Sequence, residues 1–121
     1  MNKIVIRGHE FELGVYDLDE LKRRDDADKV LGQKIAAVDL IGDPTYGSLV
    51  MVLDELERFF DDALGAGSLA VILDGKRDVA DALEAYYELR DAILDATLTR
   101  AMEIARRAKV PEKYNMDKVK R

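Results

Sequence analysis

The chain has 121 residues, 48% hydrophobic and 36% charged, with 19 Lys and Arg against 25 Asp and Glu and a net charge of −6. The absence of cysteine excludes disulfides, thiolate catalysis, zinc–thiolate sites and iron–sulfur clusters, and the single histidine excludes sites that need two imidazoles. This composition predicts one folded domain with a true core, no membrane span and, without a signal peptide after Met1, a cytoplasmic location.

The first element expected is a short β-hairpin. Residues 3–7 are short and β-branched at their centre, and residues 10–13 alternate Glu-Phe-Glu-Leu. Gly8-His9 between them predicts a type II′ turn, because glycine accepts the positive φ at its first position. An isolated hairpin is marginal in water, so it must dock on the helices or on another copy. His9 is interpreted as a turn residue, since no nucleophile motif accompanies it.

A first helix is predicted to begin at Leu18, because Asp17 and Glu20 form an Asp version of the capping box. Its N-terminal half is poor in apolar residues and is expected to be an exposed arm. Gly32 is expected to bend or break it, at a cost of about 1 kcal/mol relative to alanine. The packing half is expected to use the apolar positions Val30, Leu31, Ile35, Val38 and Ile41.

Gly42 is expected to end that helix, and Asp43 to cap a second one with Pro44 at its first position; this second helix is predicted over residues 45–64. Its wide apolar stripe is typical of the most buried helix of a domain. The stripe comprises Tyr46, Leu49, Val50, Leu53, Leu56, Phe60 and Leu64, widened by Val52, Phe59 and Ala63. After residues 65–67, Ser68 is predicted to cap a helical turn at residues 69–73, with a strand as the alternative.

Asp78 is predicted to cap the longest helix, over residues 79–108, which would reach roughly 45 Å. That length exceeds the needs of a domain of this size, so its last turns are expected to project. One side carries the polar residues Asp81, Glu84, Glu88, Asp91, Asp95, Thr99 and Glu103. The other side carries Leu83, Tyr86, Tyr87, Ile93, Leu94, Leu98, Ala101, Met102 and Ala105.

The elements together predict a mainly α fold, with a short N-terminal β-hairpin followed by three to four helices, the last one long. Residues 1–110 are interpreted as a single helical domain that includes the hairpin at residues 1–14. Pro111 ends the last helix, and residues 111–121 are interpreted as a basic tail.

Charge is polarised along the chain. Residues 1–99 hold 11 basic and 22 acidic side chains, a net −11, whereas residues 100–121 hold 8 basic and 3 acidic, a net +5. The basic end is expected to contact an acidic partner, such as the acidic helix face of another copy, or simply to suit the helix macrodipole. The like charges at residues 84–95 are expected either to meet a basic partner or to form a solvated face. The acidic body argues against nucleic-acid binding.

No catalytic, cofactor or metal site is expected. The acidic cluster at residues 17–28 lacks the glycine and closing glutamate of a calcium loop. Asp61 and Asp62 are adjacent on a helix and point in different directions, which is unsuited to a paired-carboxylate site. Residues 65–68 lack the lysine of a phosphate loop.

Four segments carry a resemblance to a known class of proteins. They are the hairpin at residues 4–13 with Tyr16-Asp17, Phe-Phe-Asp-Asp-Ala-Leu-Gly at 59–65, Ile-Leu-Asp-Gly-Lys-Arg-Asp at 72–78, and Ala-Leu-Glu-Ala-Tyr at 82–86. Residues 3–95 thus resemble small proteins of tail-gene clusters in phages and prophages of Gram-positive bacteria, which look like tail assembly chaperones. The resemblance implies a helical adaptor that coats the apolar tape-measure protein, engages tail-tube subunits before assembly, and has no catalytic residues.

The hypothesis from the sequence is a non-enzymatic protein that binds partners through apolar helix surface and forms homo-oligomers. The alternatives are a structural virion or self-assembling helical protein and, third, a small nucleic-acid-binding regulator. The candidate partner-binding residues are Tyr46, Val52, Phe59, Tyr86, Tyr87, Met102, Arg106, Arg107 and Lys109.

Overall fold

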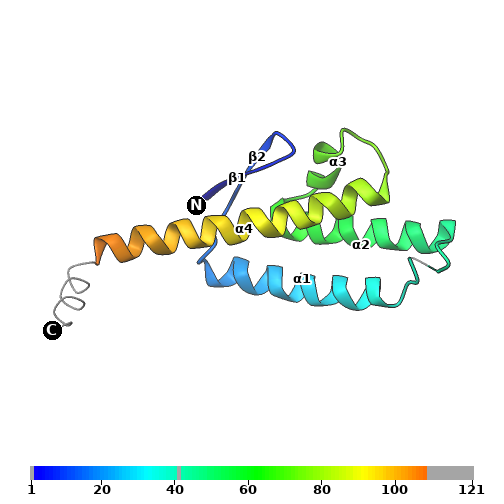
Figure 1. Cartoon of the computed structure of the whole chain (residues 1–121), viewed down its shortest axis with the longest axis horizontal. Helices are drawn as coiled ribbons and strands as arrows, with labels where there is room; N and C mark the ends of the chain where they lie inside the picture. Colours follow the sequence, from blue (N-terminus) through cyan, green and yellow to red (C-terminus); the bar gives the residue numbers. More distant parts are fainter. Residues whose placement is uncertain (1, 41, 109–121) are drawn as a thin grey trace.

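Two antiparallel strands are followed by helices, the last of them long, as the sequence predicted (Figure 1). The computed structural model describes residues 2–40 and 42–108. The elements are β1 (Asn2–Ile6), β2 (His9–Leu13), α1 (Leu18–Ala36), α2 (Tyr46–Leu64), α3 (Ser68–Ile72) and α4 (Val79–Arg107). The expected tail at residues 111–121 lies outside the described residues. No helix in the described part is both long enough and apolar enough to cross a membrane.

The hairpin turns one residue earlier than predicted. Arg7 and Gly8 are its central residues, both with positive φ, which is the pattern of a type I′ turn. The predicted II′ turn at Gly8-His9 is wrong, because His9 belongs to β2 and pairs with Ile6. This register keeps Ile4, Ile6 and Leu13 in the core. The hairpin docks on the chain's own α4 and α2.

Helix α1 begins at Leu18 as predicted, with the Asp17 carboxylate accepting a hydrogen bond from the backbone N–H of Glu20 at 3.0 Å. Of the bend or break expected at Gly32, the break is wrong, since the helix runs through Gly32 to Ala36. The helix ends before Val38, where backbone bonds from residues 37 and 38 close the last turn. Ile41 lies outside the described residues.

The N-terminal half of α1 is not an exposed arm, because α1 packs along α2 and buries the side chain of Arg24, which is 5% exposed. The Arg24 guanidinium donates to the carbonyl of Gly14 at 3.3 Å and lies 3.8 Å from the Glu20 carboxylate. Burial lowers the pKa of Arg24. The aliphatic part of the Arg24 side chain thus occupies a buried position where the helical pattern would predict an apolar residue.

Helix α2 is the central helix, as its wide stripe predicted. Thr45 and Ser48 form a reciprocal capping box at its start, so the predicted cap at Asp43 is wrong. Its buried apolar residues are Val52, Leu53, Leu56, Phe59, Phe60 and Ala63. The run that follows forms the helix α3, whose cap is Gly67, so the predicted cap at Ser68 is wrong. The buried hydroxyl of Ser68 instead donates to the carbonyl of Phe60 at 3.0 Å.

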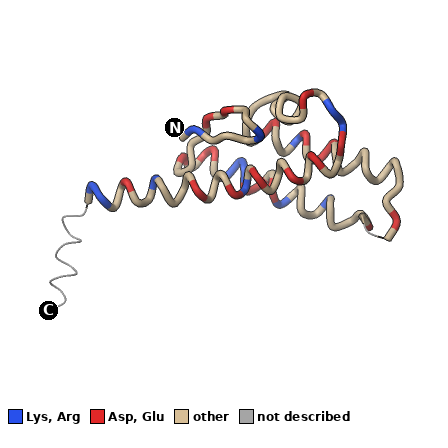
Figure 2. The backbone as a smooth tube through the Cα atoms, turned by 45° about the horizontal axis from the view of Figure 1, so that its top comes forward, with Lys and Arg blue, Asp and Glu red and all other residues tan. Residues whose placement is uncertain are grey.

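Helix α4 has 29 residues and therefore extends about 43 Å. Its C-terminal turns project beyond the rest of the described chain, as expected (Figure 1). Part of its acidic face meets a basic group of the same chain, because Arg7 in the hairpin turn lies 2.9 Å from Glu84 and 3.5 Å from Glu88. Figure 2 shows acidic residues along α4 and basic residues near its end.

Candidate functional site

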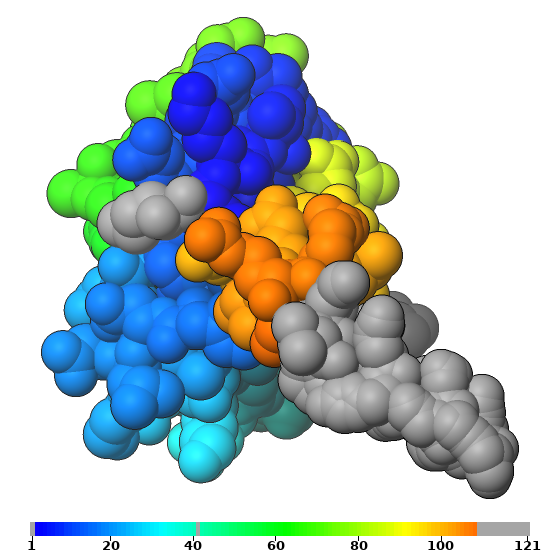
Figure 3. All heavy atoms as spheres, turned by 90° about the vertical axis from the view of Figure 1, so that its left-hand side faces the viewer, coloured from blue at the N-terminus to red at the C-terminus, as the bar shows by residue number. Residues whose placement is uncertain are grey.

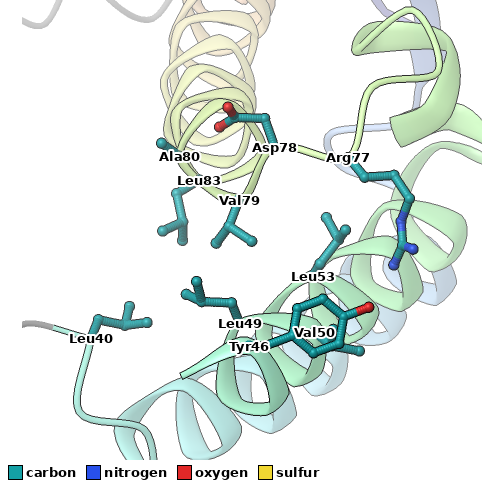
Figure 4. Close-up of a pocket in the computed structure, with 10 residues that line it drawn as sticks. All are labelled: Leu40, Tyr46, Leu49, Val50, Leu53, Arg77, Asp78, Val79, Ala80 and Leu83. Carbon is teal, nitrogen blue, oxygen red and sulfur yellow. The ribbon is translucent and has the colours of Figure 1, made fainter. Parts of the chain in front are cut away.

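An open apolar groove of about 680 Å³ lies where α2 reaches beyond the first turn of α4 (Figures 1 and 4). Its lining residues come from the chain before α2, from the first half of α2, and from the start of α4. They are Leu40, Tyr46, Leu49, Val50, Leu53, Arg77, Asp78, Val79, Ala80 and Leu83.

The two helix starts position this groove. The capping box at Thr45 begins α2 just before Tyr46, and the Asp78 carboxylate begins α4 by accepting from the backbone N–H of Asp81 at 2.9 Å. Since α2 starts farther out, the beginning of α2 extends past the start of α4 (Figure 1). Side chains on this part of α2, which a longer α4 would cover, are therefore left at the surface.

The groove is apolar at its base and walls. Leu53 is buried at the base, the walls are half-buried, and Tyr46 at the rim is 84% exposed. Figure 4 shows Val79 and Leu83 of α4 opposite Leu49 of α2, with open space between them.

The charged groups at the rim already have partners. Arg77 lies 4.0 Å from Asp54, and the Asp78 carboxylate caps α4. Small-molecule sites usually place a few polar groups inside an apolar pocket, and here the lining polar groups stay at the rim. An apolar groove between helices suits the apolar face of an amphipathic helix.

The predicted partner-binding residues do not form one surface. Tyr46 lies in the groove, whereas Tyr87 and Met102 are exposed farther along α4 and Arg106 and Arg107 lie in its last turn. Lys109 lies outside the described residues.

Three of the candidates are core residues, so their expected place on a binding surface is corrected. Val52, Phe59 and Tyr86 are all buried. The rings of Phe59 and Tyr86 pack edge to face at 5.3 Å across the α2–α4 contact. The stripe of α2 is wide because several elements cover it, which sequence alone does not distinguish from a binding face.

The sequence reasoning missed Leu40 and Val79 as groove residues. Leu40 follows α1, and Val79 is the first residue of α4. The apolar Val79 directly after the cap Asp78 was only a weak signal for a groove, because the sequence does not indicate which distant segment that side chain faces.

A second feature is a polar cluster that joins α1 to α4. The Tyr86 hydroxyl donates to the Asp28 carboxylate, and Arg90 donates to the same hydroxyl at 3.5 Å. The Arg90 guanidinium also lies 5.7 Å from the centre of the Tyr86 ring. Burial, followed by the hydrogen bond to Asp28, raises the pKa of Tyr86 to about 12.

This raised pKa predicts an alkaline loss of stability. In the unfolded chain Tyr86 ionises near its ordinary pKa of 10, whereas in the folded chain it stays neutral to about pH 12. Its contribution is therefore complete below about pH 10 and is lost as the pH rises from about 10 to about 12. Urea unfolding at about pH 9 and about pH 11.5 should show a smaller loss in Tyr86→Phe than in the wild type. Equal losses in both proteins would contradict this role for Tyr86.

Within residues 2–40 and 42–108, no group of three or more His, Cys, Asp or Glu side chains is placed to hold a metal ion. The site with the clearest geometry there is the apolar groove.

In a comparison with family models, residues 7–121 match a family of unknown function (DUF6673). The chain belongs to this family. A search of curated proteins and a search of solved structures each gave no match. The matched region begins at the hairpin turn and includes both walls of the groove.

Proposed function

We propose that this member of the family is a non-enzymatic adaptor that binds an amphipathic helix of a partner protein in the groove between α2 and α4. The observation that carries the proposal is the uncovered apolar start of α2, with Tyr46 at its rim and Leu53 at its base. Helix-in-groove binding needs this kind of apolar channel and no reactive group.

The class of partner comes from the resemblance of residues 3–95 to tail assembly chaperones. A tape-measure protein is a long apolar helical chain, and its segments match the chemistry of the groove. The proposed setting is the cytoplasm of a bacterial host, with the tail tube protein as a second partner. A structural or self-assembling role remains the alternative, favoured by the exposed end of α4.

Replacing Val50 with glutamate tests the groove. Val50 is half-buried in the groove wall, so a carboxylate there would be desolvated against an apolar helix. We expect Val50→Glu to weaken the complex with the tape-measure protein encoded in the same gene cluster by more than about tenfold. Co-expression of the two full-length proteins, followed by size-exclusion chromatography, measures the complex.

Val71→Glu is the matched control, because Val71 is exposed on α3 and does not line the groove. It should leave the complex intact, and the circular dichroism of both variants should match the wild type. Failure of the wild-type pair to form a complex, or equal binding by Val50→Glu, would overturn the proposed function.

A further inference from the structure

Helix α4 carries an apolar stripe that nothing in the described chain covers. Tyr87, Leu94, Leu98 and Met102 are each between 55% and 62% exposed. They lie on the side of α4 away from its buried residues Ala82, Ala85, Tyr86 and Leu89. The hairpin and α1 flank α4 on either side, which leaves this stripe open (Figures 1 and 3).

The stripe has the spacing of a coiled-coil seam. Residues 87, 91, 94, 98, 101 and 105 alternate steps of four and three, which is the a/d pattern of a heptad repeat. Their side chains are Tyr, Asp, Leu, Leu, Ala and Ala, so the large residues come first and the small ones last. Two copies of this seam pack best when the helices run in opposite directions, because the end with the Tyr side chain then lies against the end with the Ala side chains.

We propose that this stripe binds the α4 helix of a second copy in an antiparallel dimer, with Leu94 of each copy opposite Leu98 of the other. In this register Tyr87 faces Ala105 of the second copy, and Asp91 faces Ala101. The large Tyr87 ring thus meets a small side chain at each end of the seam, and the two Leu94–Leu98 pairs fill its centre, as close packing requires. The contact uses the same patch on both copies and therefore closes at two subunits.

Charge supports the same orientation. The register sets Arg106 at the level of residue 86 of the second copy, on the flank of the helix that carries Glu84 and Glu88. These carboxylates have only Arg7 as a basic partner among the described ion pairs. A parallel, in-register alignment would instead set Arg106 at the level of Arg106 of the second copy, about 27 Å along the axis from Glu88.

The dimer leaves the groove free, because Tyr46, Val50 and Val79 lie outside the stripe. The inference is therefore independent of the proposed function. A failed dimer would leave groove binding untouched, and a failed tape-measure complex would leave the dimer untouched.

Sedimentation of the full chain tests the contact. We expect a concentration-dependent dimer whose dissociation constant rises by more than about tenfold in Leu98→Glu, because each copy then buries a carboxylate at the centre. Val71→Glu, an exposed valine on α3, is the control and should dimerise as the wild type does. A wild type that stays monomeric at high concentration, or an undiminished dimer of Leu98→Glu, would overturn the proposal.

Cross-linking tests the direction and register, because the chain has no cysteine of its own. Asp91→Cys and Ala101→Cys proteins are mixed under reducing conditions and then oxidised. The proposed register predicts a disulfide between the two different variants, because residue 91 of one copy faces residue 101 of the other. Two cysteines at the same position would lie about 15 Å apart along the axis, too far for a disulfide. Homodisulfides as the main product would indicate parallel pairing and contradict the model.

A charge exchange supplies a third readout. Arg106→Glu should raise the dissociation constant severalfold, and adding Glu88→Arg in the same chain should recover most of the loss. Absence of any recovery would show that these two side chains do not face each other.

Discussion

Phe60→Ala is expected to lower the free energy of unfolding by about 3–5 kcal/mol, the largest loss that a single truncation should produce in this chain. Phe60 is the largest of the fully buried side chains and lies on the central helix α2. Its ring packs edge to face on Phe59 at 5.9 Å. Removing it leaves a cavity, and domains of this size are stable by only about 5–15 kcal/mol. Urea unfolding followed by circular dichroism measures the change.

Tyr46→Ala is the matched control for Phe60→Ala, because it removes an aromatic ring from the same helix at an exposed position. It should change the free energy of unfolding by no more than about 0.5 kcal/mol. In the proposed function it should still weaken binding of a partner helix, since Tyr46 lines the groove. A loss below about 1 kcal/mol in Phe60→Ala would contradict the buried position of that ring.

Ile6→Ala is expected to cost about 2–5 kcal/mol. The Ile6 side chain is fully buried at the end of β1, on the face of the hairpin that packs against the helices. An isolated two-stranded hairpin is marginal, so its stability depends on this apolar face. Thermal and urea unfolding of the full chain would measure the loss.

Val5→Ala provides the comparison, because the preceding residue points to the other face of the same strand and is 58% exposed. We expect its free energy of unfolding to lie within about 0.5 kcal/mol of the wild type. Similar losses in Val5→Ala and Ile6→Ala would mean that the strand register is different.

The hairpin also connects stability to the proposed contacts of α4. Strand β1 packs on α4, and Arg7 holds Glu84 and Glu88 on the flank of the exposed stripe. The stripe and the groove lie on helices that this shared core supports, so the core variants above should be compared with the surface variants only after their folding is measured.

Local sequence signals determined where most elements begin. Asp17 and Asp78 each accept a backbone hydrogen bond at the helix start that the sequence predicted, whereas the cap of α2 is Thr45 and not the predicted Asp43. These signals are reliable because a cap satisfies backbone groups only a few residues away. The alternation of β2 and the excess length of α4 were likewise evident without any long-range contact.

Tertiary structure alone decided which apolar faces are covered. The stripe of α2 reads the same along its length, yet Val52 and Phe59 are core while Tyr46 is exposed. The apolar side of α4 is similarly divided, with Tyr86 buried against α2 and Leu98 at the surface. Periodicity records that a face is apolar, but its burial depends on which distant helix lies above it and how far that helix reaches. The groove and the uncovered stripe, the two surfaces on which both proposals depend, exist because α2 and α4 overlap over only part of their lengths.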